Sequence, residues 1–222
     1  MKNFILVFAV LAVVLCVSLA PAQAETIKIG LTVRVDSVGD SYNLLEDKIH
    51  VDDIITGFYT YDSLTSNSAT YPAYEGAYQY TTAPYGMSLT VGGFTFRTDP
   101  ANVNFVIGLT NVNGEPDYYT VNSNNNLAVG DGLSVDSMHW QLTDYFGTAL
   151  SNTELPLMPM DLSKWQSNSL VIRGGQYPFP SPGEKTLFEI IGHVTDVHLV
   201  PEPISLGLLG FGSLLLRRNC RK

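Results

Sequence analysis

Residues 27–36 read Ile-Lys-Ile-Gly-Leu-Thr-Val-Arg-Val-Asp, and this stretch decides the fold class. Apolar side chains occupy every second position from Ile27 to Val35, with polar residues or glycine between them. A period of two places all the apolar side chains on one face of an extended strand, because successive side chains point to opposite sides. The stretch therefore predicts a long strand with one buried face.

Further segments show the same period or are rich in β-branched residues. They lie at 56–61, 87–91, 94–98, 102–110, 118–121, 134–143, 169–172 and 187–199. Gly92 and Gly93 stand between two of them and predict a tight hairpin. Within the segment 134–143, Met138, Trp140 and Leu142 fall on one face.

Helical periodicity is nearly absent from the rest of the chain. Short turns are predicted at 43–47 and at 161–165, where Asp161 could cap the backbone. About nine strands, each with one buried face, must close on one another to bury those faces. We therefore predict an all-β fold, an antiparallel β-sandwich of jelly-roll type, for residues 25–200.

The first 24 residues are typical of a secretory signal peptide. A basic start at Lys2 precedes an apolar run at 4–19, and Ala22 and Ala24 form a small-x-small cleavage site. We expect signal peptidase to cut after Ala24.

The last 22 residues, 201–222, have three parts in a fixed order: Pro201-Glu202-Pro203, a glycine-containing apolar run at 204–216, and a cationic end that includes Arg217 and Arg218. As a helix the apolar run would measure about 20 Å, whereas the hydrocarbon core of a bilayer is about 30 Å thick. The segment is therefore a poor permanent anchor. It could enter the inner membrane transiently while the cationic end stays on the cytoplasmic side.

This tail resembles the PEP-CTERM sorting signal of Gram-negative bacteria. The resemblance implies that a membrane protease-transpeptidase, exosortase, recognises Pro201-Glu202-Pro203 and removes the apolar and basic parts. It also implies release or transfer beyond the inner membrane, to the cell surface or extracellular matrix, in a strain that makes exopolysaccharide. The segments 57–62 and 90–93 are similar to those of a β-rich class of PEP-CTERM proteins with no settled activity.

Trimming both ends changes the charge and the cysteine content. It removes five of the 12 basic residues and keeps all 21 acidic ones, so seven basic residues remain and the net charge is −14. Such a surface repels nucleic acid. Cys16 and Cys220 lie in the removed segments, so the mature chain has neither a disulfide nor a cysteine nucleophile.

Acidic residues gather between Asp36 and Asp53. Hard cations favour carboxylate oxygens on loops, which makes Asp52 and Asp53 weak candidates for Ca²⁺ ligands. A solvated acidic loop is the alternative interpretation. No other cofactor and no transition-metal site is expected.

Seven of the 12 tyrosines lie between Tyr59 and Tyr85. Tyrosine rings can stack on sugars, and Tyr74, Tyr78 and Tyr80 are the candidates for glycan contact. Tyrosine is also a favoured strand residue, so these side chains could instead half-bury in a sheet.

A hydrolase is the third possibility. Gly39-Asp40-Ser41 resembles the nucleophile block of SGNH hydrolases, but the late Asp-x-x-His of that family is missing, and Asp196 and His198 are only two positions apart. No catalytic residue is assigned.

The sequence favours a non-catalytic, exported cell-surface or extracellular-matrix protein that is processed by exosortase and associated with exopolysaccharide in a biofilm. The alternatives are a carbohydrate- or calcium-dependent binding module and a secreted hydrolase.

Overall fold

The computed structural model describes residues 26–130, 132–176 and 186–201. They form ten strands and one short 3-10 helix: β1 Thr26–Gly39, β2 Ile54–Asp62, β3 Glu75–Tyr80, β4 Gly86–Val91, β5 Phe94–Arg97, β6 Phe105–Thr110, β7 Asp117–Ser123, β8 Ser134–Asp144, η1 Leu162–Lys164, β9 Ser167–Gln176 and β10 Thr186–Leu199. The predicted all-β class is confirmed. In these ranges no helix has the length and apolar character needed to cross a membrane.

All ten strands belong to one antiparallel sheet, in the order β3-β6-β7-β8-β9-β10-β1-β2-β4-β5. This corrects the predicted jelly-roll sandwich, which would have two separate sheets. A single sheet buries its apolar face by curling on itself, so the described fold is a half-barrel.

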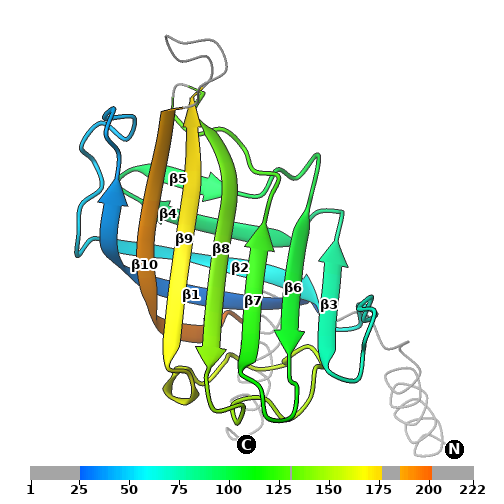
Figure 1. The fold of residues 1–222 in the computed structure, drawn as a ribbon. Coiled ribbons are helices and arrows are strands. Elements are labelled where there is room, and N and C mark those ends of the chain that lie inside the picture. The colour runs from blue at the N-terminus through cyan, green and yellow to red at the C-terminus, as the bar shows by residue number, and fades with distance from the viewer. Residues whose placement is uncertain (1–25, 131, 177–185, 202–222) are drawn as a thin grey trace, which may run out of the picture.

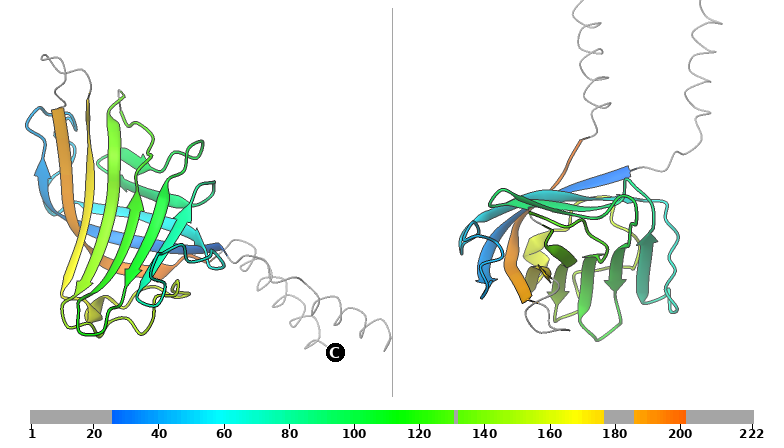
Figure 2. Two further views of the ribbon diagram at one scale, coloured as in Figure 1. Left: turned by 45° about the vertical axis from the view of Figure 1, so that its right-hand side comes forward. Right: turned by 90° about the horizontal axis from the view of Figure 1, so that it is seen from above.

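The curl creates two layers that cross (Figure 1). β3, β6, β7, β8 and β9 form the front layer, and β1, β2, β4 and β5 run across behind it. Figure 2 shows the two layers from above. β10 starts beside β9 in the front layer and bends into the back layer. β1 starts in the back layer and bends near its C-terminal end, so that it remains paired with β10.

β1 and β10 can serve both layers because they are long and irregular. Each has 14 residues, or about 46 Å of extended chain. Their pairing shifts register between Thr32 and Val33 and again between Val35 and Ser37. Such irregularities bend a strand and increase its twist, so the sheet folds over at this point.

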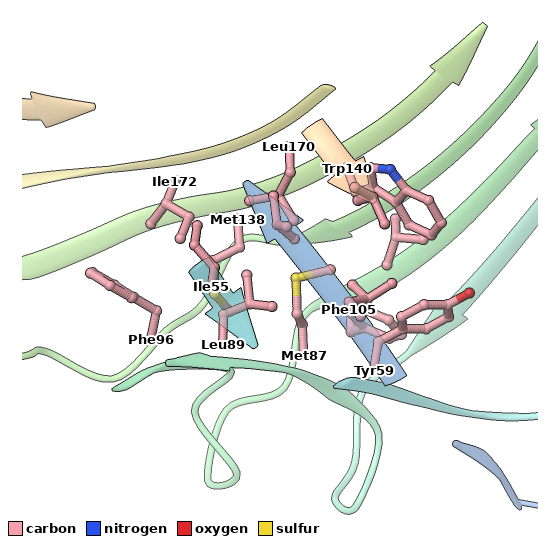
Figure 3. Packing of buried hydrophobic residues seen from close by; sticks show 14 of the residues in the cluster. Ile55, Tyr59, Met87, Leu89, Phe96, Phe105, Met138, Trp140, Leu170 and Ile172 are labelled. Carbon is pink, nitrogen blue, oxygen red and sulfur yellow. The ribbon is translucent and has the colours of Figure 1, made fainter. Parts of the chain in front are cut away.

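Apolar side chains from the two layers fill the space between them (Figure 3). Tyr59 of β2 lies against Trp140 of β8 with 6.1 Å between ring centroids. Phe96 of β5 and Phe188 of β10 are likewise 6.1 Å apart. These contacts join residues far apart in the sequence, so the core depends on the curl of the sheet.

Two local predictions are confirmed. Gly92 and Gly93 link β4 and β5 with φ angles of 57° and 83°, values that an L side chain rarely adopts. Asp161 caps η1, since its carboxylate accepts a hydrogen bond from the N–H of Ser163 at 3.1 Å. The strand β3 was not predicted, because its two tyrosines are its only large residues with an apolar body and the rest of it is glycine, alanine and polar residues.

The connection between β8 and β9 closes one end of the half-barrel, below the lower ends of β7 and β8 in Figure 1. Leu155 and Trp165 of this connection are buried in the core. The Tyr78 hydroxyl donates to the Thr153 carbonyl at 2.8 Å, and the Tyr61 hydroxyl donates to the Pro156 carbonyl. Buried tyrosine hydroxyls therefore hold the closing segment in place.

We expect Leu31→Ala to cost about 2–5 kcal/mol of unfolding free energy, the range for truncating a buried leucine. Leu31 is 1% exposed and pairs with Gly57 of β2 and Val197 of β10. Urea unfolding followed by circular dichroism measures the loss. Thr90→Ala, on the exposed side of β4, is the control and should stay within about 0.5 kcal/mol. Equal stability of the two variants would contradict the central place of β1.

Candidate functional site

Of the predicted processing residues the structure describes Pro201, which is exposed and lies two residues after the end of β10. The N–H of Val200 donates to the Lys28 carbonyl at 2.8 Å, whereas Pro201 has no N–H to continue the pairing. Ile29 pairs with Leu199, so both ends of the described domain lie side by side. The other predicted residues, Ala22, Ala24, Glu202, Pro203, Arg217 and Arg218, lie outside the described residues.

The three candidate tyrosines differ in their exposure to solvent. Tyr74 is 50% exposed, whereas Tyr78 and Tyr80 are 5% and 3% exposed and belong to the core. The Tyr80 hydroxyl donates to the Asp62 carbonyl at 3.1 Å. Tyr78 and Tyr80 therefore cannot stack on a sugar, and the alternative interpretation, half-burial in a sheet, holds for this pair. Their positions two residues apart on β3 turn both rings inward.

Burial suppresses ionisation of the core tyrosines. It raises the pKa of Tyr80 to about 12, and with the nearby Tyr61 it raises the pKa of Tyr59 far above the ordinary value. The Tyr59 and Tyr119 hydroxyl oxygens are 3.0 Å apart and share a hydrogen bond. These hydroxyls are structural groups, each with a hydrogen-bond partner inside the core.

Asp52 and Asp53 make local contacts in the connection between β1 and β2. Asp52 lies 3.6 Å from the guanidinium of Arg34, and the Asp53 carboxylate accepts a hydrogen bond from the N–H of His50 at 2.8 Å. In the ranges that the structure covers, no three His, Cys, Asp or Glu side chains are grouped so as to hold a metal ion. The predicted weak calcium ligands are thus not joined by a third carboxylate.

The elements of the proposed hydrolase site are far apart. Gly39, which precedes Asp40 and Ser41, pairs with Glu189, whereas His198 pairs with Gly30 at the opposite end of β1. The Asp40 carboxylate instead accepts the N–H groups of Leu44 and Leu45 at 2.8 and 2.7 Å. The resemblance of Gly39-Asp40-Ser41 to a nucleophile block is therefore explained by a capped turn.

Asp117 and Asp144 form a buried pair of acids that the sequence did not reveal. They are direct cross-strand partners on β7 and β8, and neither side chain is exposed. The Asp144 carboxylate accepts hydrogen bonds from Phe146, Thr148 and Ala149 at 2.6–3.0 Å. Asp117 accepts one from the N–H of Leu150 at 2.8 Å, and its Oδ1 has no partner among the described groups.

Paired carboxylates are the usual machinery of glycoside hydrolysis, but a substrate cannot reach this covered pair. The two carboxylates accept backbone hydrogen bonds from the first residues of the connection between β8 and β9 and so fix their conformation. Burial opposes ionisation of Asp144, but its hydrogen bonds outweigh that effect and lower the pKa below the ordinary value.

The solvent side of the front layer carries a surface of another kind, here called the outer face. It consists of three rows of cross-strand neighbours from β3 to β9. The rows are Gln79, Val106, Asn122, His139 and Val171; Ala77, Gly108, Thr120, Gln141 and Ser169; and Glu75, Thr110, Tyr118, Thr143 and Ser167. Thr143 is itself buried, at 4% exposure. Glu75 is the one Asp, Glu, Lys or Arg residue in these rows.

Polar side chains on the outer face contact one another. The Asn122 amide oxygen contacts Nδ1 of His139, and His139 Nε2 lies 3.2 Å from the Gln141 amide oxygen. The Gln141 amide donates to the Thr143 hydroxyl at 3.1 Å. These contacts fix the side chains, so the outer face is a preorganised surface of amides, hydroxyls and an imidazole.

A hollow of about 350 Å³ opens on the outer face over Gly108. Its lining includes Thr110, Tyr118 and Thr120 from the neighbouring strands and Ser68 and Thr70 from the β2–β3 connection. A Cβ atom at Gly108 would come within 2.6 Å of the Thr120 hydroxyl oxygen. The Thr120 side chain therefore packs directly against the Gly108 backbone, and both residues line the hollow.

A second, wider depression of about 830 Å³ lies between the β4–β5 turn and residues 127–130. Its charged lining is mixed, with Glu46, Lys48 and Arg97, and Lys48 is paired with Glu46. This site offers less uniform chemistry than the outer face.

No protein-family model matches the chain, and neither the known proteins nor the solved structures compared with it provide a match. Function is therefore inferred from the residues and their arrangement.

Alkali should unfold the protein as the core tyrosines ionise. Their pKa is raised in the fold, so their contribution to stability is complete below the ordinary tyrosine value of about 10 and is lost as pH rises through the folded values. For Tyr80 this window ends near the folded pKa of about 12. Tyrosinate absorbance and far-ultraviolet circular dichroism should change together in this range. Ionisation of Tyr59 and Tyr119 with the β signal intact would contradict their burial.

Asp144→Asn should remove a pH-dependent part of the stability. Because the folded pKa of Asp144 is lowered, its contribution is present above the unfolded value of about 3.9 and is lost as pH falls through the folded value. The wild-type advantage in urea midpoint should therefore be clear at about pH 6 and small at about pH 2.5. The exposed Glu115→Gln variant is a control for general charge effects. An advantage that is equal at both pH values would rule out the carboxylate as its source.

Proposed function

We propose that this chain is an exported, non-catalytic cell-surface or extracellular-matrix protein, trimmed at its start by signal peptidase and at its end by exosortase. It works beside the exopolysaccharide of a biofilm. The proposal rests on the signal-peptide pattern of residues 1–24 and on the order of Pro201-Glu202-Pro203, apolar run and Arg217-Arg218 in the tail.

The position of Pro201 is the structural observation that best supports the proposal. Backbone pairing of β10 ends with the hydrogen bond from Val200 to Lys28, and the exposed Pro201 begins the motif immediately afterwards. A protease that cuts beyond this point removes no strand and no described core residue. Such a cut would leave every described strand in place.

The composition of the trimmed chain suits an extracellular location. Its net charge of −14 favours solubility. It contains no cysteine, so its stability comes from the packed core between the layers and does not depend on the redox state of the surroundings. The hydroxyl and backbone contacts of the core tyrosines add to this packing.

The described chain ends and the outer face lie on different sides of the domain. The described ends lie in the back layer, and the outer face lies on the front layer (Figure 2, right). Before the tail is cut, the outer face would therefore be turned away from the point of attachment.

Glu202→Ala, or the double substitution of Arg217 and Arg218 by alanine, should leave the protein uncut in the inner membrane of its producing strain. Cell fractionation and intact-mass measurement locate the protein and define both its ends. Wild-type protein from outside the cells should lack Ala24 at its start and Cys220 at its end. Asp161→Ala, which leaves the tail unchanged, should be processed as wild type. Normal release of the Glu202 variant would overturn the sorting proposal.

A further inference from the structure

We infer that the outer face, centred on the Gly108 hollow, is a binding site for a neutral polysaccharide. This deepens the proposed function by naming the class of partner, and it rests on that function only for where the two would meet. This site differs from the predicted glycan contacts at Tyr78 and Tyr80, because both of those side chains lie in the core.

The charge distribution selects the class of ligand. The mature chain has 21 acidic and seven basic residues, yet four of the five strands that form the outer face contribute no charged residue to its three rows. An ordinary solvated sheet face carries charged side chains for solubility. The rows contain no Lys or Arg that could pair with a polyanion, and the surrounding negative charge repels one. A neutral ligand with many hydroxyl groups is not repelled.

The spacing of the rows suits an extended chain of sugars. Neighbouring strands lie about 4.8 Å apart, close to the length of one pyranose unit. A polysaccharide laid across the strands would meet Thr120, Gln141 and Ser169 in turn, with one hydrogen-bonding side chain on each strand. Hydroxyls and amides both donate and accept hydrogen bonds, as sugar hydroxyls do.

The Gly108 hollow adds a place for a single ring. Tyr118 supplies an aromatic side chain to its lining, while Thr110 and Thr120 supply hydroxyl groups. Aromatic rings contribute apolar contact area against the C–H faces of sugars, and hydroxyls at the rim bind their edges. Glu75, which also lines the hollow, is positioned to accept hydrogen bonds from sugar hydroxyls.

The edge of the sheet beside the hollow is protected. The Asn67 side chain accepts from the N–H of Ala77 at 3.0 Å and donates to the Glu75 carbonyl at 2.8 Å, and Ser68 N–H donates to the Ala77 carbonyl at 2.9 Å. These contacts occupy groups on β3 that could otherwise pair with a strand of another molecule. The outer face therefore ends at β3, because these contacts prevent a further strand from pairing there.

The test uses the protein as recovered from its producing cells, with whichever ends it retains. Its migration is compared in native gels without polysaccharide and in gels that contain the neutral or the acidic fraction of the strain's own exopolysaccharide. We expect slower migration in the neutral fraction, unchanged by added salt because no ion pairs are involved. The double substitution Tyr118→Ala with Gln141→Ala should raise the Kd by about tenfold or more.

Three further variants make the result specific. Thr90→Ala with Thr95→Ala changes an exposed hydroxyl pair on β4 and β5 and should bind as wild type. Tyr118→Phe keeps the ring and should retain most of the binding. If the alanine variant folds poorly, Thr120→Arg places a long side chain over the hollow without touching the core, and it should abolish the retardation.

Retardation in the acidic fraction only, in neither fraction, or unchanged by all of the outer-face substitutions would overturn the inference. None of these results depends on whether the tail has been removed. Failure of the binding site and failure of the sorting proposal can therefore be told apart.

Discussion

The pairing of β1 with β10 is the interaction on which the rest of the structure depends. It joins the first and last strands of the domain and holds the front and back layers in one sheet. The shifts of register near Val33 and Val35 let both strands turn from one layer into the other. Without this pairing each layer would expose an apolar face, and neither β2–β4–β5 nor β3–β6–β7–β8–β9 contains enough surface to bury its own.

Much of the fold could be predicted from period-two patterns, because one buried face leaves a clear signal in strands such as β1 and β8. The number of sheets could not. Alternation shows that a face is buried but not which other strand covers it, and a 14-residue strand can belong to two layers. The jelly-roll prediction failed at this point, since it assigned each strand to a single sheet.

The candidate site was harder to predict than the fold, because it depends on register. Thr120, Gln141 and Ser169 come from three separated segments, and only their pairing brings them into one row. The tyrosine-rich segment misled for a related reason. Tyr78 and Tyr80 look alike in composition to Tyr74, but their parity on β3 turns them inward, while Tyr74 lies just before the strand. The buried pair of Asp117 and Asp144 left no local signal in the sequence.

The place of β10 in the sheet also has a consequence for biogenesis. Although it is synthesised last, β10 lies in the interior of the sheet, between β9 and β1. The first strand must therefore wait for the last one before most of its long-range contacts can form, and topologies of this kind fold slowly. A chain that threads a translocation channel from its N-terminus would remain unfolded until its C-terminal strand emerges. Completion of the sheet would then wait for the very last strand of the domain, and the interior place of β10 makes folding a late, all-or-none event.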